Sequence, residues 1–131
     1  MTDILDETLK HWRQTRFAYG ATDCLLSIND YIVACGGYDA LAAFKGTYDT
    51  AEGAQAHLDA YGGPEGMIAL FGLRPIDPAD AARGDIVIID PRGGDVLAGI
   101  CTGEGIAART ERSVIEINKR FVTLTHAWRI D

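Results

Sequence analysis

The chain has 131 residues, of which 47% are hydrophobic and 24% charged, a composition typical of one globular domain. Its formal net charge of -7 and its scattered Lys and Arg residues exclude the long basic patch of a nucleic-acid-binding protein. No apolar stretch approaches the roughly 18 residues of a membrane span, and the acidic N-terminus does not resemble a signal peptide. We therefore expect a single domain over residues 1–131, with neither a nucleic acid partner nor a membrane span.

The first half of the chain has the apolar spacing of helices, with glycines at their ends. Thr22 or Asp23 is expected to cap the second helix, and Asp49 and Glu52 have the spacing of a capping box before the third. Helices are predicted over residues 4–16, 24–35, 50–61 and 64–71, with a shorter one around 39–44.

The pattern changes at Gly84, after a proline-containing segment over 73–83 that predicts a loop. Short β-branched runs separated by turn residues, one of them the turn over 91–95, then predict strands. The predicted strands span residues 85–90, 96–101, 106–110, 113–117 and 121–130. Helices followed by an antiparallel sheet indicate an α+β fold, with a helical part of about 1–72 and a sheet part of about 84–131.

Three cysteines are present, Cys24, Cys35 and Cys101. Their odd number, without a secretory signal, argues against a disulfide framework. The spacing of cysteines and histidines matches no zinc-binding motif, so neither a metal nor a cofactor is expected.

Cys24 has the position of a reactive thiol. It follows a predicted capping residue, and the unpaired N–H groups in the first turn of a helix stabilise a thiolate and could hold an oxyanion. The neighbouring carboxylate of Asp23 acts in the opposite direction, because a second negative charge raises a thiol pKa. Cys24 also begins the apolar stripe of its helix, and unpaired cysteines are often buried. The residues alone therefore allow a nucleophile, a core residue, or a redox or acyl-carrying thiol.

The stretch from Phe17 to Cys24, F-x-Y-G-x-x-D-C, resembles the nucleophile motif of the NlpC-type cell-wall peptidases, which are papain-like cysteine peptidases. The segments RGDIVIID and LAGICTG, residues 83–90 and 97–103, are similar to two of their strands. This resemblance implies a papain-like fold with Cys24 at the nucleophile position. It also implies that the substrate would lie against Tyr19, Gly20 and Asp23.

Over nearly its whole length the chain resembles a small phage and prophage family that is related to these peptidases and encoded among tail genes. The shared segments are Y-G-x-x-D-C, G-x-Y-x-T-A-x-G at 46–53, R-G-D at 83–85 and A-W-R at 127–129. The resemblance implies a virion tail protein, made in the cytoplasm of the bacterial host, that contacts other proteins of the tail tip or hub. Peptidoglycan peptide stems would be the substrate of an active form.

The sequence departs from the peptidase pattern at three positions and in one spacing. The gap between the aromatic-Gly pair and Asp-Cys is shorter than usual. The histidine that the peptidases carry at the start of the second strand is Leu97 here, and a leucine neither accepts a proton nor stabilises a thiolate. The Ser-Gly pair that usually follows the cysteine is Leu25-Leu26.

One of the three histidines could replace the missing base. His11 and His57 lie on predicted helices, whereas His126 lies on the last predicted strand, and a strand can pack against the cysteine helix. His126 shares a strand face with Trp128, so a buried Trp128 would turn the imidazole inward. His126 is therefore the preferred candidate for a base within hydrogen-bond reach of the thiol.

Two functions follow from these observations. In the first, the chain is a degenerate NlpC-like domain with a structural or interaction role in a phage tail tip. In the second, it is an active cysteine peptidase or amidase, in which Cys24 attacks a peptide carbonyl and His126 acts as the base. Loss of the usual histidine favours the first function, and retention of the Asp-Cys helix start favours the second.

Overall fold

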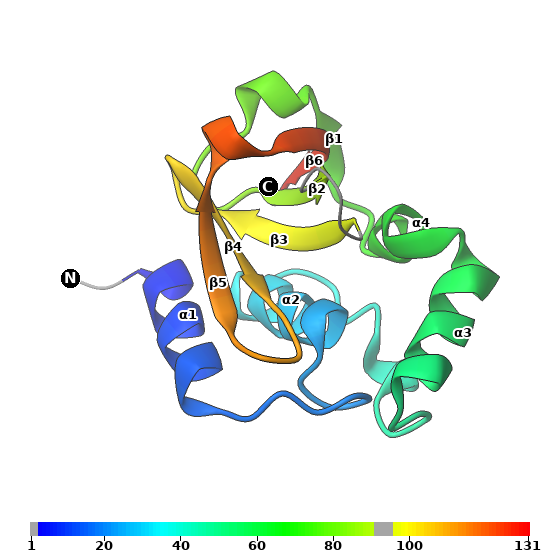
Figure 1. The fold of residues 1–131 in the computed structure, drawn as a ribbon. Helices are drawn as coiled ribbons and strands as arrows, with labels where there is room; N and C mark the ends of the chain where they lie inside the picture. The colour runs from blue at the N-terminus through cyan, green and yellow to red at the C-terminus, as the bar shows by residue number, and fades with distance from the viewer. Residues whose placement is uncertain (1–2, 91–95) are drawn as a thin grey trace.

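A computed structural model describes residues 3–90 and 96–131, so the predicted turn over 91–95 lies outside the described residues. These residues form four α-helices and a six-stranded antiparallel sheet (Figure 1). The helices are α1 (Ile4–Gln14), α2 (Cys24–Ala34), α3 (Ala51–Tyr61) and α4 (Gly63–Ala69). The strands are β1 (Arg74–Ile76), β2 (Ile86–Asp90), β3 (Leu97–Cys101), β4 (Gly105–Arg109), β5 (Val114–Asn118) and β6 (Thr123–Arg129). The predicted α+β class is confirmed.

The sheet has the order β1-β6-β2-β3-β4-β5, which places the last strand beside the first two rather than at an edge. β1 is a correction to the sequence prediction, which assigned 73–83 to a loop. Its three residues pair with Ala127–Arg129 of β6. Pro75 is tolerated because β1 is an edge strand, where a missing N–H costs little. The predicted helix around 39–44 is also shorter than expected, a 3-10 turn over Ala42–Phe44.

Side-chain caps set where the helices begin. Asp23 caps α2, with one carboxylate oxygen 3.1 Å from the Leu26 N–H. Thr50 caps α3, and its hydroxyl accepts from the Gly53 N–H at 3.1 Å. The predicted capping box led by Asp49 is therefore wrong, because the helix begins one residue later than that box requires.

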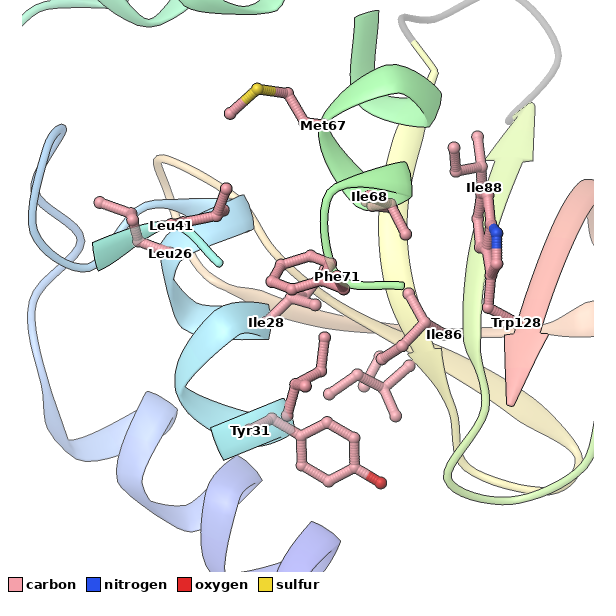
Figure 2. Packing of buried hydrophobic residues seen from close by; sticks show 14 of the residues in the cluster. Leu26, Ile28, Tyr31, Leu41, Met67, Ile68, Phe71, Ile86, Ile88 and Trp128 are labelled. Carbon is pink, nitrogen blue, oxygen red and sulfur yellow. The ribbon is translucent and has the colours of Figure 1, made fainter. Parts of the chain in front are cut away.

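The larger core cluster lies between the helices and one face of the sheet. Figure 2 shows Ile68 and Phe71, from α4 and the residues after it, between Ile28 of α2 and Ile86 of β2. Trp128 of β6 closes the same cluster and is 7% exposed. Trp128 is thus buried, which is the condition under which His126 is expected to turn inward.

A second, smaller cluster covers the opposite face of the sheet, where Val87 and Ile89 of β2 meet Cys101 and Ile106. Alternate residues of β2 thus belong to different clusters, and four successive residues of this strand are buried. Burial on both faces explains the continuous apolar run in a strand of an antiparallel sheet.

Candidate functional site

Asp23 joins the two segments that precede and follow α2. It is 5% exposed, and besides capping the helix it accepts from the Gly20 N–H at 2.9 Å and from the Tyr48 hydroxyl at 2.5 Å. The Gly46 N–H donates to the Gly20 carbonyl at 2.9 Å. A Cβ atom at Gly20 would lie 1.9 Å from the Tyr48 carbonyl oxygen, and Gly20 has a φ of 79°. Glycine is therefore required where the two segments meet.

Cys24 is the first residue of α2, and its thiol donates to the Ala98 carbonyl of β3 at 3.3 Å. Cys24 is half-buried and packs against the larger core cluster. Burial raises the pKa of the thiol to about 12, and the Asp23 carboxylate acts in the same direction. The helix N-terminus therefore does not produce a thiolate at neutral pH.

A pocket of about 620 Å³ opens over Cys24, between α2, α3 and the sheet. Its lining includes Tyr19 and Asp23, so three of the predicted site residues come together here. Gly20 contacts this group through its hydrogen bond to Asp23. Most other lining residues are apolar or aromatic, among them Phe17, Phe44, Tyr48, Leu58 and Met67.

The Leu97 side chain packs against the smaller hydrophobic cluster, on the face of the sheet opposite to the larger cluster that Cys24 contacts. Leu97 is the first residue of β3, it lines the pocket, and it precedes the residue whose carbonyl accepts from Cys24. The backbone at the position where the resemblance expects a histidine is thus near the cysteine, whereas the side chain is directed to the other face of the sheet. This side chain is apolar and supplies no base.

His126 does not meet Cys24, and its predicted role as the partner of the thiol requires correction. Its Nε2 lies 3.1 Å from the Glu65 carboxylate, and its ring stacks on Trp128 with centroids 5.8 Å apart. Ala98 and His126 both pair with Ile88, so they are two strands apart, roughly 10 Å. The two-residue period correctly placed His126 on the same face of β6 as Trp128. It could not show that β2 lies between β6 and β3, because periodicity does not determine the order of strands in a sheet.

His57 is the histidine that lines the pocket together with Cys24. It lies on α3, its Nε2 is 3.2 Å from the Thr47 hydroxyl, and its ring centroid is 5.0 Å from that of Tyr48. The sequence predicted that His57 lies on a helix face next to the apolar stripe, but did not place it near Cys24. Its position next to Leu58 in the apolar stripe of α3 was a signal that it lies at the edge of a buried face.

The segments R-G-D at 83–85 and A-W-R at 127–129 meet at an ion pair between Asp85 and Arg129. Arg129 approaches Asp85 with two nitrogens, at 2.8 and 3.1 Å, and Asp85 also accepts from the Ala82 N–H at 2.8 Å. Asp85 is 4% exposed. This contact joins the segment before β2 to the end of β6, so R-G-D and A-W-R have a structural explanation.

The residues described hold no group of three or more His, Cys, Asp or Glu side chains close enough to bind a metal ion. Over the same residues, every helix is too short or too polar to cross a bilayer.

Comparison with known proteins gives one match. Residues 2–130 fit the family model described as a domain of unknown function, DUF6950. No curated protein and no solved structure matches the chain. Because the model covers nearly the whole sequence, the chain belongs to the DUF6950 family.

Proposed function

We propose that the chain is a catalytically inactive, NlpC-like papain-type domain with a structural or interaction role at the tail tip or hub of a phage-like particle. The observation that carries this proposal is the state of Cys24. Its thiol donates to the Ala98 carbonyl, its pKa is raised to about 12, and the position of the usual histidine is taken by Leu97, which supplies no base. A cysteine nucleophile needs a base or cation that favours the thiolate.

The pocket over Cys24 suits an interaction role. It is concave, largely apolar and rich in aromatic side chains, which is the character of sites that hold a ligand or a segment of a partner. Asp23 holds the pocket walls together by accepting hydrogen bonds from the Tyr48 hydroxyl and from two backbone N–H groups, so these polar residues are explained without a catalytic reaction.

An active peptidase remains the second candidate because of His57. This imidazole lines the same pocket as Cys24 but comes from α3, whereas the resemblance expects the base on a strand. In an active form His57 would leave the Thr47 hydroxyl and approach the thiol. The two candidates therefore differ in whether Cys24 reactivity depends on His57.

Alkylation of the native chain by iodoacetamide between pH 6 and pH 10 separates these candidates, with each cysteine followed by mass spectrometry. For an inactive site, the Cys24 rate rises about tenfold per pH unit without a plateau, because thiolate is the reactive species. His57→Gln should leave this profile unchanged, as should the control variant His11→Gln. A plateau near neutral pH that is lost in His57→Gln, together with hydrolysis of peptidoglycan stems, would replace the proposal by the peptidase.

The tail assignment has its own test. Particles from a host that carries the gene should contain the chain after gradient purification, in a fixed ratio to other tail proteins. Recovery of the chain only outside the particles would contradict the assembly role without affecting the chemistry of Cys24.

A further inference from the structure

A second pocket, of about 490 Å³, lies between the end of α1 and the turn that joins β4 to β5. In Figure 1 this turn lies beside the segment that follows α1, and hydrogen bonds from Arg109 to Thr15 connect the two. Four of the chain's 12 Lys and Arg residues line this one pocket, although the chain has a net charge of -7. They are Arg13, Arg16, Arg109 and Arg112.

Arg109 is a buried cation that has no paired anion among residues 3–90 and 96–131. It is 3% exposed, and its guanidinium donates to the hydroxyl and the carbonyl of Thr15, at 3.0 and 2.6 Å. Both acceptors are neutral. Buried charges in proteins are usually paired, because a lone buried charge loses its hydration without compensation. Burial also lowers the pKa of Arg109.

The remaining charges around the pocket leave an excess of positive charge. Arg13 pairs with Glu116 at 2.7 Å, whereas Arg16 and Arg112 are exposed and make no ion pair within the described residues. Glu111 is the opposing carboxylate in the lining, and it accepts from the Tyr19 hydroxyl at 3.3 Å. One lining carboxylate therefore faces four guanidinium groups.

We propose that this arginine pocket binds the oxyanion of a ligand, a carboxylate or a phosphate. The planar guanidinium matches both groups with two parallel hydrogen bonds. The arginine pocket and the pocket over Cys24 share Phe17, Arg109, Thr110 and Glu111 in their linings, so one ligand can extend from one to the other. Such a ligand has an anionic end at the arginines and an apolar part near Cys24. This inference does not depend on whether Cys24 is catalytic.

The proposal is tested by titrating the full chain with inorganic phosphate, and separately with citrate. Binding is monitored through the amide NMR signals at constant chloride concentration. We expect saturable binding below about 10 mM, with the largest shifts at residues 109–113. The double variant Arg16→Gln/Arg112→Gln keeps the buried Arg109 and should bind at least about tenfold more weakly, because it loses two charged hydrogen-bond donors. The tighter of the two probes identifies the preferred group.

The matched control is Arg74→Gln/Arg120→Gln, which removes the same charge from exposed arginines that do not line this pocket. It should change either affinity by less than about twofold. Equal losses in the two double variants would mean attraction by overall charge, and would overturn the proposal. Absence of saturable binding of both probes would overturn it as well, and neither result would alter the alkylation profile of Cys24.

Discussion

Asp23 and Asp85 are the same residue type in two similar positions, yet they have different partners. Both are almost completely buried, with 5% and 4% of their surface exposed, and each accepts hydrogen bonds from backbone N–H groups at the start of an element. Asp23 receives its side-chain hydrogen bond from the Tyr48 hydroxyl, which is neutral. Asp85 receives two from the Arg129 guanidinium, which is charged.

The partner decides what each carboxylate does to its surroundings. Arg129 compensates the charge of Asp85, so that contact joins β2 to β6 and has a purely structural effect. The Tyr48 hydroxyl leaves the charge of Asp23 uncompensated beside Cys24, where it acts with burial to raise the pKa of the thiol. The position of an Asp-Cys pair at a helix start is therefore not sufficient to activate the cysteine.

Removing the cation at the Asp85 site should have the largest effect on stability. Arg129→Leu leaves Asp85 buried without its counter-charge, and we expect a loss of about 2–3 kcal/mol. This value lies below the range for fully buried pairs because the Arg129 side chain is 35% exposed. Urea denaturation of the variant measures the loss. Arg74→Leu, which removes an exposed ion pair, is the control and should cost less than about 1 kcal/mol. Equal losses in the two variants would contradict the distinction.

Removing the charge at the Asp23 site should change chemistry more than stability. Asp23→Asn keeps an oxygen for the Leu26 N–H but loses acceptor capacity toward Gly20 and Tyr48, at a cost of about 1–2 kcal/mol. Without the negative charge the pKa of Cys24 falls, and alkylation at pH 8 should accelerate at least about threefold. Asp85→Asn should leave the Cys24 rate unchanged. An unchanged rate in Asp23→Asn would show that burial alone holds the proton.

Removing the Tyr48 hydroxyl, the neutral partner of Asp23, should have a smaller effect than removing the charge of Asp23. Tyr48→Phe deletes one hydrogen bond, and Asp23 keeps its two backbone donors, so we expect a loss of about 1 kcal/mol in urea denaturation. The pKa of Tyr48 is raised by burial and by its donation to Asp23, so the hydroxyl carries no charge that the variant would remove. A loss above about 3 kcal/mol would mean that Tyr48 also holds the pocket wall in another way.

The smallest effect is expected at Asp3, an exposed carboxylate that pairs with Arg83. Arg83 donates to Asp3 and lowers the pKa of that carboxyl from its ordinary value of 3.8. Because the pKa of Asp3 is lower in the folded chain than in the unfolded chain, the ionised carboxylate stabilises the fold at pH values above its ordinary pKa. This stabilisation is lost as the pH falls through the pKa of the folded chain. Asp3→Asn should therefore lower Tm slightly at pH 6 and not at pH 2.5. Asp3 also caps α1, where it accepts from the Asp6 N–H at 2.8 Å. An equal reduction of Tm at both pH values would assign the effect to this cap instead.

Local features of the chain were predictable from the sequence, and long-range neighbours were not. Asp23 as a cap and Cys24 at a helix start follow from patterns within a few residues. β1 was missed because a three-residue strand with a proline is recognised only through its pairing with β6. His57 was placed on a helix but not at the pocket, since that depends on how α3 packs. The arginines looked scattered because Arg16 and Arg109 meet only after α1 lies beside the β4–β5 turn.

The protonation state of Cys24 in the folded chain tests most directly whether the site is inactive. The chain, labelled with ¹³C at the cysteine Cβ, would be titrated by NMR from pH 5 to pH 10, with Cys24→Ser to assign the signal. We predict no titration of Cys24 over this range, because its pKa is raised to about 12. A titration midpoint near or below pH 7 would show an activated thiolate, and would contradict the proposal that the site is inactive.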